Sequence, residues 1–134
     1  MKQTIKFKYT ILYVTDVLQS IAFYEKAFGF QRKFISPDNQ YGELASGKTT
    51  LSFAEKKLAA SHLKNGFEES SLARKPFGME IAFTTDNVEA TLLSVTEAGG
   101  TVIENPKTTA WGQVIAYVRD PDGFLIEVCT ELDH

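Results

Sequence analysis

The sequence predicts an α+β domain built from two βαβββ modules, and three features support this fold class. First, a weak internal repeat relates Ile11–Phe30 to Ile81–Gly100, with Asp16 matching Asp86 at an offset of 70 residues. Second, each copy consists of an apolar strand, a Thr-Asp pair, an amphipathic helix and a glycine. Third, the residues after each glycine alternate with period two or form short apolar runs, as strands do. Each half is therefore predicted as one strand, one helix and three further strands.

Both predicted helices carry signals for their start and their end. Asp16 and Asp86 each lie three residues before a Gln or a Glu, which is the spacing of a capping box at a helix start. Gly29 and Gly99–Gly100 are predicted stops. The predicted apolar faces consist of Ile21, Tyr24, Ala27 and Phe28 in the first helix, and of Val88, Leu92, Val95 and Ala98 or Gly99 in the second.

The remaining strands are separated by stretches typical of turns. In the first half we predict strands near Gln31–Ile35, Gln40–Ala45 and Thr50–Ala54, with turns at 36–39 and 46–48. In the second half we predict strands near Thr101–Glu104, Gly112–Val118 and Phe124–Thr130, with turns at 105–107 and 120–123.

A polar segment at residues 57–76 separates the two halves, with a predicted short helix at Leu58–Lys64. Long connections of this kind are either flexible or functional, so the segment is a mobile connection or a lid over a site. We expect one domain over residues 1–134, with module one at 1–56 and module two at 77–134.

Composition and charge restrict the class of function. The net charge is -3, and no stripe of Lys and Arg stands out, which argues against a nucleic-acid partner. The single cysteine, Cys129, excludes an intramolecular disulfide and is expected to be a buried apolar filler. No stretch approaches the length that spans a bilayer, and the first residues lack the apolar region of a signal peptide. A cytoplasmic protein without a membrane partner is the expectation.

Two stretches make the chain resemble the vicinal oxygen chelate superfamily, the group of glyoxalases, bleomycin-resistance proteins and extradiol dioxygenases. They are D-x-x-x-S-x-x-F-Y-x-x-x-F-G-F at Asp16–Phe30 and D-P-x-G-x-x-I-E at Asp120–Glu127. The resemblance covers essentially the whole chain. It implies that the sheets of the two modules curl into a cup, with the helices outside and the site inside. It also implies a homodimer, and in bleomycin-resistance-like members the modules pair across the subunits.

The resemblance further implies four positions that hold a metal ion in metal-dependent members. Carried over one by one, these positions fall on Tyr9, where many members have His, and on Ser52, Glu80 and Glu127. Two carboxylates are a poor site for zinc or nickel, which favour His and Cys ligands. Neither histidine of the chain matches a ligand position. We therefore expect no metal cofactor, and the alternative is a magnesium or manganese ion held weakly by Glu80 and Glu127.

Strand alternation predicts which side chains line the cup. The predicted ligand-binding residues are Tyr9, Tyr13, Tyr41, Glu43, Ser52, Trp111, Gln113 and Tyr117, and the candidate catalytic residues are Glu80 and Glu127. An aromatic cup with a few polar groups is the usual make-up of a small-molecule site. If Glu80 and Glu127 face each other, one of them is expected to be protonated, because desolvation and a like charge both raise the pKa of a carboxyl group.

Two classes of function remain open. The first is a metal-independent binding protein that sequesters a hydrophobic or cationic compound, as the bleomycin-resistance-like members do in antibiotic resistance. An acidic, aromatic cup suits a cation through ring faces and carboxylate pairing. The second is a lyase, isomerase or dioxygenase that uses a weakly held metal or a glutamate base. The missing histidines favour the first class.

Overall fold

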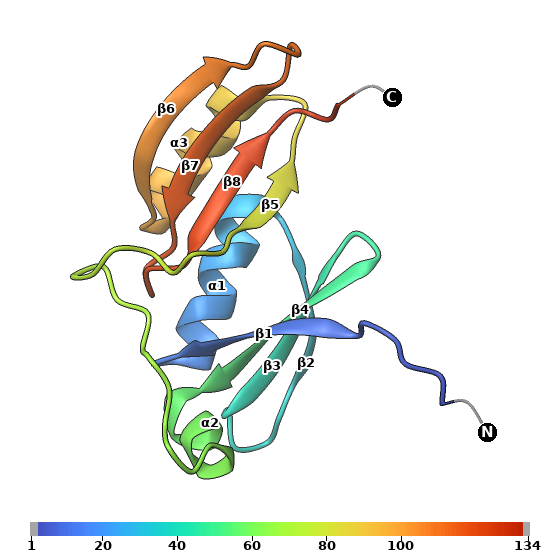
Figure 1. Ribbon diagram of the computed structural model, residues 1–134, viewed down its shortest axis with the longest axis vertical. Helices are drawn as coiled ribbons and strands as arrows, with labels where there is room; N and C mark the ends of the chain where they lie inside the picture. Colours follow the sequence, from blue (N-terminus) through green and yellow to red (C-terminus); the bar gives the residue numbers. More distant parts are fainter. Residues whose placement is uncertain (1–2, 133–134) are drawn as a thin grey trace.

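The computed structural model describes residues 3–132 and contains two βαβββ modules joined by one connecting segment (Figure 1). Module one consists of β1 (Tyr9–Val14), α1 (Val17–Phe28), β2 (Gln31–Ile35), β3 (Tyr41–Ser46) and β4 (Thr49–Glu55). Module two consists of β5 (Ile81–Thr84), α3 (Val88–Ala98), β6 (Thr101–Thr108), β7 (Val114–Arg119) and β8 (Leu125–Cys129). A short helix, α2 (Lys56–His62), follows β4 directly. The predicted α+β class and the order of elements are confirmed.

Each module forms its own four-stranded sheet, and the two sheets have the same topology. The strand order is β1-β4-β3-β2 in sheet one and β5-β8-β7-β6 in sheet two. The first strand of each module runs parallel to its last strand, and the other neighbours are antiparallel. In the described part of the chain no hydrogen-bonded strand pair joins the sheets. The strands β1 and β5 are therefore both edge strands.

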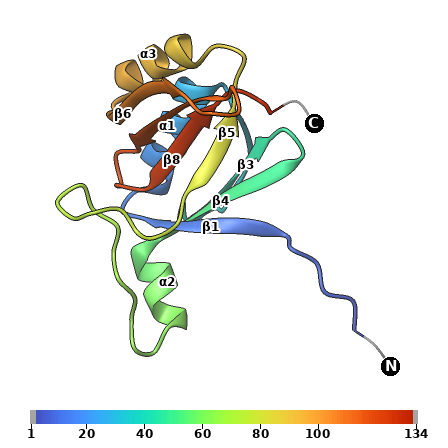
Figure 2. The same cartoon turned by 45° about the horizontal axis from the view of Figure 1, so that its top comes forward.

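The hydrophobic core lies between the sheets and the helices α1 and α3, which pack against each other. Its members include Leu12, Leu44 and Phe53 from sheet one, Ile126 and Val128 from sheet two, and Ile21, Tyr24 and Val95 from the helices. The helix α2 lies at the opposite end of the molecule from α3 in both views (Figures 1 and 2). No helix within residues 3–132 combines the length and hydropathy needed to cross a bilayer.

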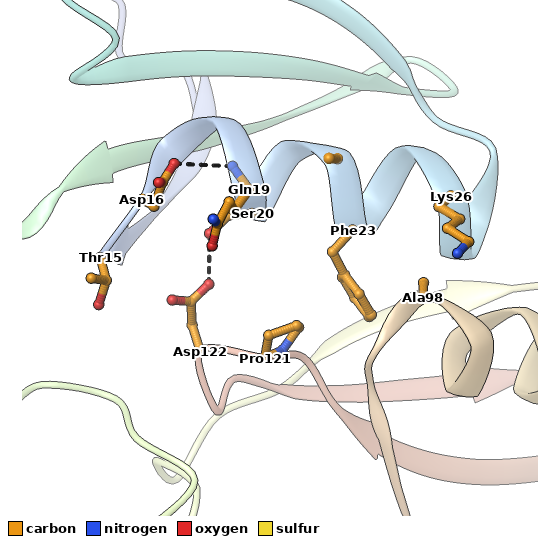
Figure 3. A pocket seen from close by; sticks show the side chains of 10 residues that line it. Thr15, Asp16, Gln19, Ser20, Phe23, Lys26, Ala98, Pro121 and Asp122 are labelled. Carbon is orange, nitrogen blue, oxygen red and sulfur yellow. Dashed lines mark hydrogen bonds between the residues drawn. The ribbon is translucent and has the colours of Figure 1, made fainter.

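The turn at 120–123 connects module two to α1 of module one. Tyr24 donates a hydrogen bond to Oδ2 of Asp120, and both residues are fully buried. Beside this contact, the Ser20 hydroxyl donates to Asp122 at 2.6 Å, and the two side chains point toward each other in Figure 3. Burial raises the pKa of Asp120 to about 6 and also raises the pKa of Tyr24. These polar contacts hold the modules together where the apolar core ends.

The connecting segment is attached to module two through Arg119, which is 7% exposed. Its guanidinium donates to the backbone oxygens of Arg74 at 2.8 Å and Ser71 at 2.9 Å, and its Nε donates to Gly123 at 2.9 Å. Gly123 has a φ of 94°, and a Cβ at this position would lie 2.7 Å from the Ser71 carbonyl carbon. The segment therefore crosses this turn in close backbone contact.

Three of the four predicted ends of α1 and α3 agree with the structure, and the predicted start of α3 does not. Asp16 caps α1 by accepting from the Gln19 amide at 3.1 Å, and Gly29 and Gly99 adopt the predicted left-handed conformation. The predicted cap of the second helix is wrong by one residue. Asn87 caps α3 by accepting from the Ala90 amide at 3.0 Å. Asn and Asp are equally good capping residues, so residue type does not choose between Asn87 and Asp86. The burial of Val88, directly after Asn87, decides where α3 starts.

Two other local predictions are also wrong. The stretch 105–107, predicted as a turn, lies inside β6. Pro106 is tolerated there because β6 is an edge strand and its pairing with β7 shifts register at this point. Trp111 and Gln113 precede β7 in the hairpin loop and are not strand residues. The predicted strand began too early because the loop contains apolar and aromatic residues.

Candidate functional site

The predicted site residues lie on the faces of the two sheets that the helices leave uncovered. In β1, Leu12 and Val14 belong to the core, so the alternate residues Tyr9, Ile11 and Tyr13 share the opposite face. Pairing extends this uncovered face across sheet one, where Ser52 lies beside Ile11 and Glu43. In sheet two, Glu127 lies between Ala82 and Tyr117. Each sheet thus presents one uncovered face with polar and aromatic side chains.

The group on sheet one is centred on Tyr41. Its hydroxyl is hydrogen-bonded to Glu43 Oε2 at 2.7 Å and to Ser52 Oγ at 3.1 Å, with Tyr9 beside it. Burial, together with the neighbouring Glu43, raises the pKa of Tyr41, so this phenol stays protonated at any physiological pH. Ser52 is completely buried beneath these side chains. Its hydroxyl oxygen accepts a hydrogen bond from Tyr41.

The group on sheet two contains a pair of carboxyl groups. The Tyr117 hydroxyl donates to Glu127 Oε1 at 3.0 Å, and Glu80 lies close enough to Glu127 for the two carboxyl groups to shift each other's pKa. Desolvation and then the Glu127 carboxylate raise the pKa of Glu80. Partial burial acts against ionisation of Glu127, but hydrogen bonds from Cys129, Glu80 and Tyr117 outweigh it and lower its pKa. Glu80 is therefore the more weakly acidic member of the pair, and Glu127 is the more strongly acidic one.

Cys129 lies next to Glu127 on the same strand face. Burial and then the neighbouring carboxylate raise the pKa of its thiol to about 11. A thiol is a poor nucleophile compared with a thiolate. The Cys129 thiol donates instead to the backbone oxygen of Phe83, with Sγ 3.7 Å from that oxygen.

Trp111 and Gln113 lie at the end of this uncovered face. The Trp111 indole N–H donates to Gln113 Oε1 at 2.9 Å, and the Gln113 amide donates to the Thr130 oxygen at 2.9 Å. The Trp111 side chain is nevertheless 64% exposed. Its ring is thus held in a defined position while most of its surface faces solvent.

Tyr13 contacts a residue that the sequence did not single out. The ring of Phe67, in the connecting segment, meets it edge-on with centroids 4.7 Å apart. Both residues line a cavity of about 200 Å³ with Phe77, Met79 and Phe124. No periodicity in the segment indicates this contact, because the segment has no regular secondary structure there.

The predicted site residues form two groups within one chain. Tyr9, Tyr41, Glu43 and Ser52 lie on sheet one. Tyr117 and Glu127 lie on sheet two, with Glu80 directly before β5 and Gln113 directly before β7. Between residues 3 and 132, no hydrogen bond or ion pair joins a residue of one group to a residue of the other. The four positions that hold a metal in related proteins are therefore divided between two faces. We refer to the two groups as the tyrosine half-site and the glutamate half-site.

The donor atoms at these four positions do not fit a transition-metal centre. Zinc and nickel favour imidazole and thiolate ligands, whereas the chain offers two hydroxyls in one half-site and two carboxyl groups in the other. The Ser52 hydroxyl is already buried in a hydrogen bond. In residues 3–132 no three His, Cys, Asp or Glu side chains gather closely enough to hold a metal ion.

A separate groove of about 510 Å³ runs between α1 and the turn at 120–123, lined by Thr15, Asp16, Gln19, Ser20, Ala22, Phe23, Lys26, Ala98, Pro121 and Asp122 (Figure 3). It lies on the helix side of the sheets, away from both half-sites. The Ser20–Asp122 hydrogen bond crosses it. We assign this groove to the junction between the modules.

Comparisons with known proteins agree with this architecture. The family model described as Glyoxalase/Bleomycin resistance protein/Dioxygenase superfamily matches residues 6–128. A probable lactoylglutathione lyase of Vibrio cholerae is 30% identical over 125 residues, which cover 90% of this chain and 86% of that protein. A virulence protein of Salmonella typhimurium is 27% identical over 122 residues, covering 88% and 78%. A solved glyoxalase/bleomycin resistance protein/dioxygenase family enzyme from Burkholderia phytofirmans has the same fold, with a TM-score of 0.79, 23% identity, and 92% and 96% coverage.

Proposed function

Because the chain belongs to the glyoxalase/bleomycin resistance protein/dioxygenase superfamily, we propose that it binds and sequesters a small hydrophobic or cationic molecule without a metal. The observation that carries this proposal is the Glu127 carboxyl group on an uncovered sheet face, which accepts a hydrogen bond from Tyr117 and whose pKa is lowered. A positioned carboxylate attracts a cationic group, and nearby aromatic rings add to the attraction through their faces. Trp111 and Tyr41 supply such rings at the two half-sites.

The lowered pKa of Glu127 supports binding over catalysis. A general base works best when its pKa lies near the working pH. The pKa of Glu127 is lowered, which makes it a weak proton acceptor and a stable counter-ion. Cys129, with a pKa of about 11, offers no thiolate nucleophile. These groups suit the recognition of a cation better than proton abstraction.

We also propose that a homodimer completes the site. The outer edges of the sheets are protected against pairing: β2 carries Arg32, Lys33 and a register shift, and β6 carries Pro106 and two register shifts. Natural proteins use charges, prolines and bulges to block unwanted strand pairing. The edges β1 and β5 contain no charged residue and no proline. Antiparallel pairing of β1 with the β5 of a second copy would place a tyrosine half-site beside a glutamate half-site.

A thermal-shift screen tests this function. The probes are aromatic cations such as ethidium, neutral aromatics of matched size, and glutathione thioesters, each measured with EDTA and with added magnesium or manganese. We expect aromatic cations to raise the melting temperature equally with EDTA and with metal. Glu127→Gln should abolish the shift because it removes the counter-ion.

The matched control is Glu97→Gln, which changes an exposed carboxylate on α3, on the other side of the sheet. This variant should keep the full thermal shift. Conversion of a glutathione thioester that requires added metal and is lost in Glu127→Gln would instead assign the chain to the lyases, and the sequestration proposal would be wrong.

A further inference from the structure

The connecting segment between α2 and β5 borders the cavity of about 200 Å³ beside Tyr13. Figures 1 and 2 show this segment passing the end of β1 without forming a helix or a strand. We refer to its residues 63–70 as the flap. The flap brings the Phe67 ring to the Tyr13 ring, with the centroids 4.7 Å apart, and both rings line the cavity.

The flap is held less firmly than the residue that follows it. Within residues 3–132, no backbone hydrogen bond fixes residues 67–70. The ion pairs of the flap are formed by Glu68 and Glu69, whose side chains are 82% and 60% exposed, and exposed ion pairs add little stability. Ser71, by contrast, accepts a hydrogen bond from the buried Arg119 guanidinium. Stretches with few hydrogen bonds open most readily, so the flap can open while its far end stays fixed.

The size and the lining of the cavity suit a small aromatic ring. An apolar cavity of about 150 Å³ is large enough to bind benzene, and this cavity measures about 200 Å³. Phe67, Phe77 and Phe124 line it, and aromatic side chains pack edge-on or offset against a bound ring. The flexible thioether of Met79 also lines it and makes favourable contacts with aromatic rings. One benzene-sized ring with a short substituent therefore fits this space.

The same lining leads to the glutamate half-site. Four of the residues that line the cavity also line a much smaller void that reaches Glu80; they are Leu12, Phe77, Met79 and Phe124. Glu80 lies close enough to Glu127 for each carboxyl group to shift the pKa of the other. An apolar cavity and a pair of carboxyl groups thus adjoin each other within one chain.

We infer that the cavity beside the flap binds the ring of an arylalkylamine, and that the flap opens to admit it. This inference deepens the proposed function and rests on it, because Glu127 is again the counter-ion of the cationic group. The ring leaves water for an apolar lining, and the ammonium group forms charge-assisted hydrogen bonds with the carboxylate. Phe67 sets the size of the ring that fits, since it is the aromatic side chain that the flap contributes to the lining.

Methyl NMR of isotope-labelled methionine tests the cavity directly. The chain has two methionines, Met1 and Met79, and Met79 lines the cavity. Met79→Leu assigns the two signals. We expect toluene and phenethylamine to shift the Met79 signal in a saturable manner, because a nearby ring changes the local magnetic field. Ethylamine, which has no ring, should leave the signal unchanged.

The role of the charge is tested with the same signal. Phenethylamine should bind the wild type more tightly than toluene does. In Glu127→Gln the two affinities should become equal, because the counter-ion is lost while the cavity remains.

Phe67→Ala tests the flap. Removing this half-buried ring enlarges the cavity, so naphthylethylamine should bind the variant on the order of tenfold more tightly than the wild type, the gain that burying about two further carbon groups provides. The matched control is Phe7→Ala, which removes a ring that is 87% exposed. This control should bind both amines as the wild type does. Equal binding of naphthylethylamine by Phe67→Ala and the wild type would overturn the role of the flap.

The outcomes separate this inference from the proposed function. If toluene and phenethylamine leave the Met79 signal unchanged while ethidium still raises the melting temperature through Glu127, the cavity inference is wrong and the proposed function stands. If both rings shift the signal but Glu127→Gln binds phenethylamine as tightly as the wild type does, the cavity accepts rings, and the counter-ion role of Glu127 is wrong. Toluene binding needs no charge and no variant, so this test of the cavity does not depend on either.

Discussion

Tyr24 on α1 donates a hydrogen bond to the buried carboxylate of Asp120, in the turn between β7 and β8. This contact joins the two modules, since one partner comes from each. Asp120 also accepts from the backbone amides of Asp122 at 3.0 Å and Phe124 at 2.9 Å, so it organises the turn as well as the junction. The first two predictions concern this pair.

Folding stability should fall as the pH rises from about 4 to 7. Burial raises the pKa of Asp120 to about 6 from 3.8, so in this range the folded chain binds a proton that the unfolded chain has released. The contribution of Asp120 to the free energy of unfolding is therefore complete below 3.8, its pKa in the unfolded chain. This contribution is lost as the pH rises through about 6, its pKa in the folded chain. A shift of about two pKa units corresponds to at most about 3 kcal/mol. Urea denaturation of the wild type and of Asp120→Asn checks this, and an equal slope in both would contradict it.

Replacing Tyr24 with Phe should lower the free energy of unfolding by about 1–3 kcal/mol, because a buried carboxyl oxygen loses its partner. The loss should appear in chemical denaturation as a lower midpoint with an unchanged m-value. The control is Tyr13→Phe, since the structure gives the Tyr13 ring a contact with Phe67 that the substitution retains. Equal effects of the two substitutions would show that the junction does not depend on this hydrogen bond.

Gly123→Ala should be more destabilising than Gly47→Ala. Both glycines have positive φ, 94° and 59°, which costs a residue with a Cβ about 1–2 kcal/mol. At Gly47 the added Cβ meets nothing within 4 Å, whereas at Gly123 it meets the Ser71 backbone at 2.7 Å. The difference between the two melting temperatures isolates the contact with the connecting segment. Indistinguishable values would mean that the segment moves aside without cost.

Glu80 and Glu127 should titrate as one coupled pair. Carbon-detected NMR of the carboxyl groups should show Glu127 ionising first and Glu80 only at a pKa above its usual range, because of burial and the neighbouring charge. Glu80→Gln removes one of the two ionisable groups, so a single ionisation should remain. Two independent titrations at ordinary pKa values in the wild type would contradict the coupling.

Several features followed from short-range patterns alone. The cap at Asp16, the stop at Gly29 and the alternation of Tyr9, Ile11 and Tyr13 depend on neighbours within one helical turn or one strand. Contacts between neighbouring strands of one module could also be predicted. The approach of Glu80 to Glu127 was predictable because β5 and β8 belong to one βαβββ repeat, in which the motif indicates how the first and last strands align.

Other features depended on neighbours that the sequence does not reveal. The choice of Asn87 over Asp86 as a cap depends on which side chain α3 must bury. Pro106 fits within a strand only because β6 has a free edge. Phe67 reaches Tyr13 through a segment without regular structure.

The sequence by itself predicted the two βαβββ repeats and the alternation of their strand faces, because periodicity and capping act over a few residues. Only the tertiary structure decided that β1 and β5 form no hydrogen-bonded pair within residues 3–132, so each module keeps its own sheet. The packing of α1 against α3 and the buried Tyr24–Asp120 contact, which joins residues 96 positions apart, hold the modules in this arrangement. Contacts over such distances leave no periodic signal, since they depend on how complete elements pack.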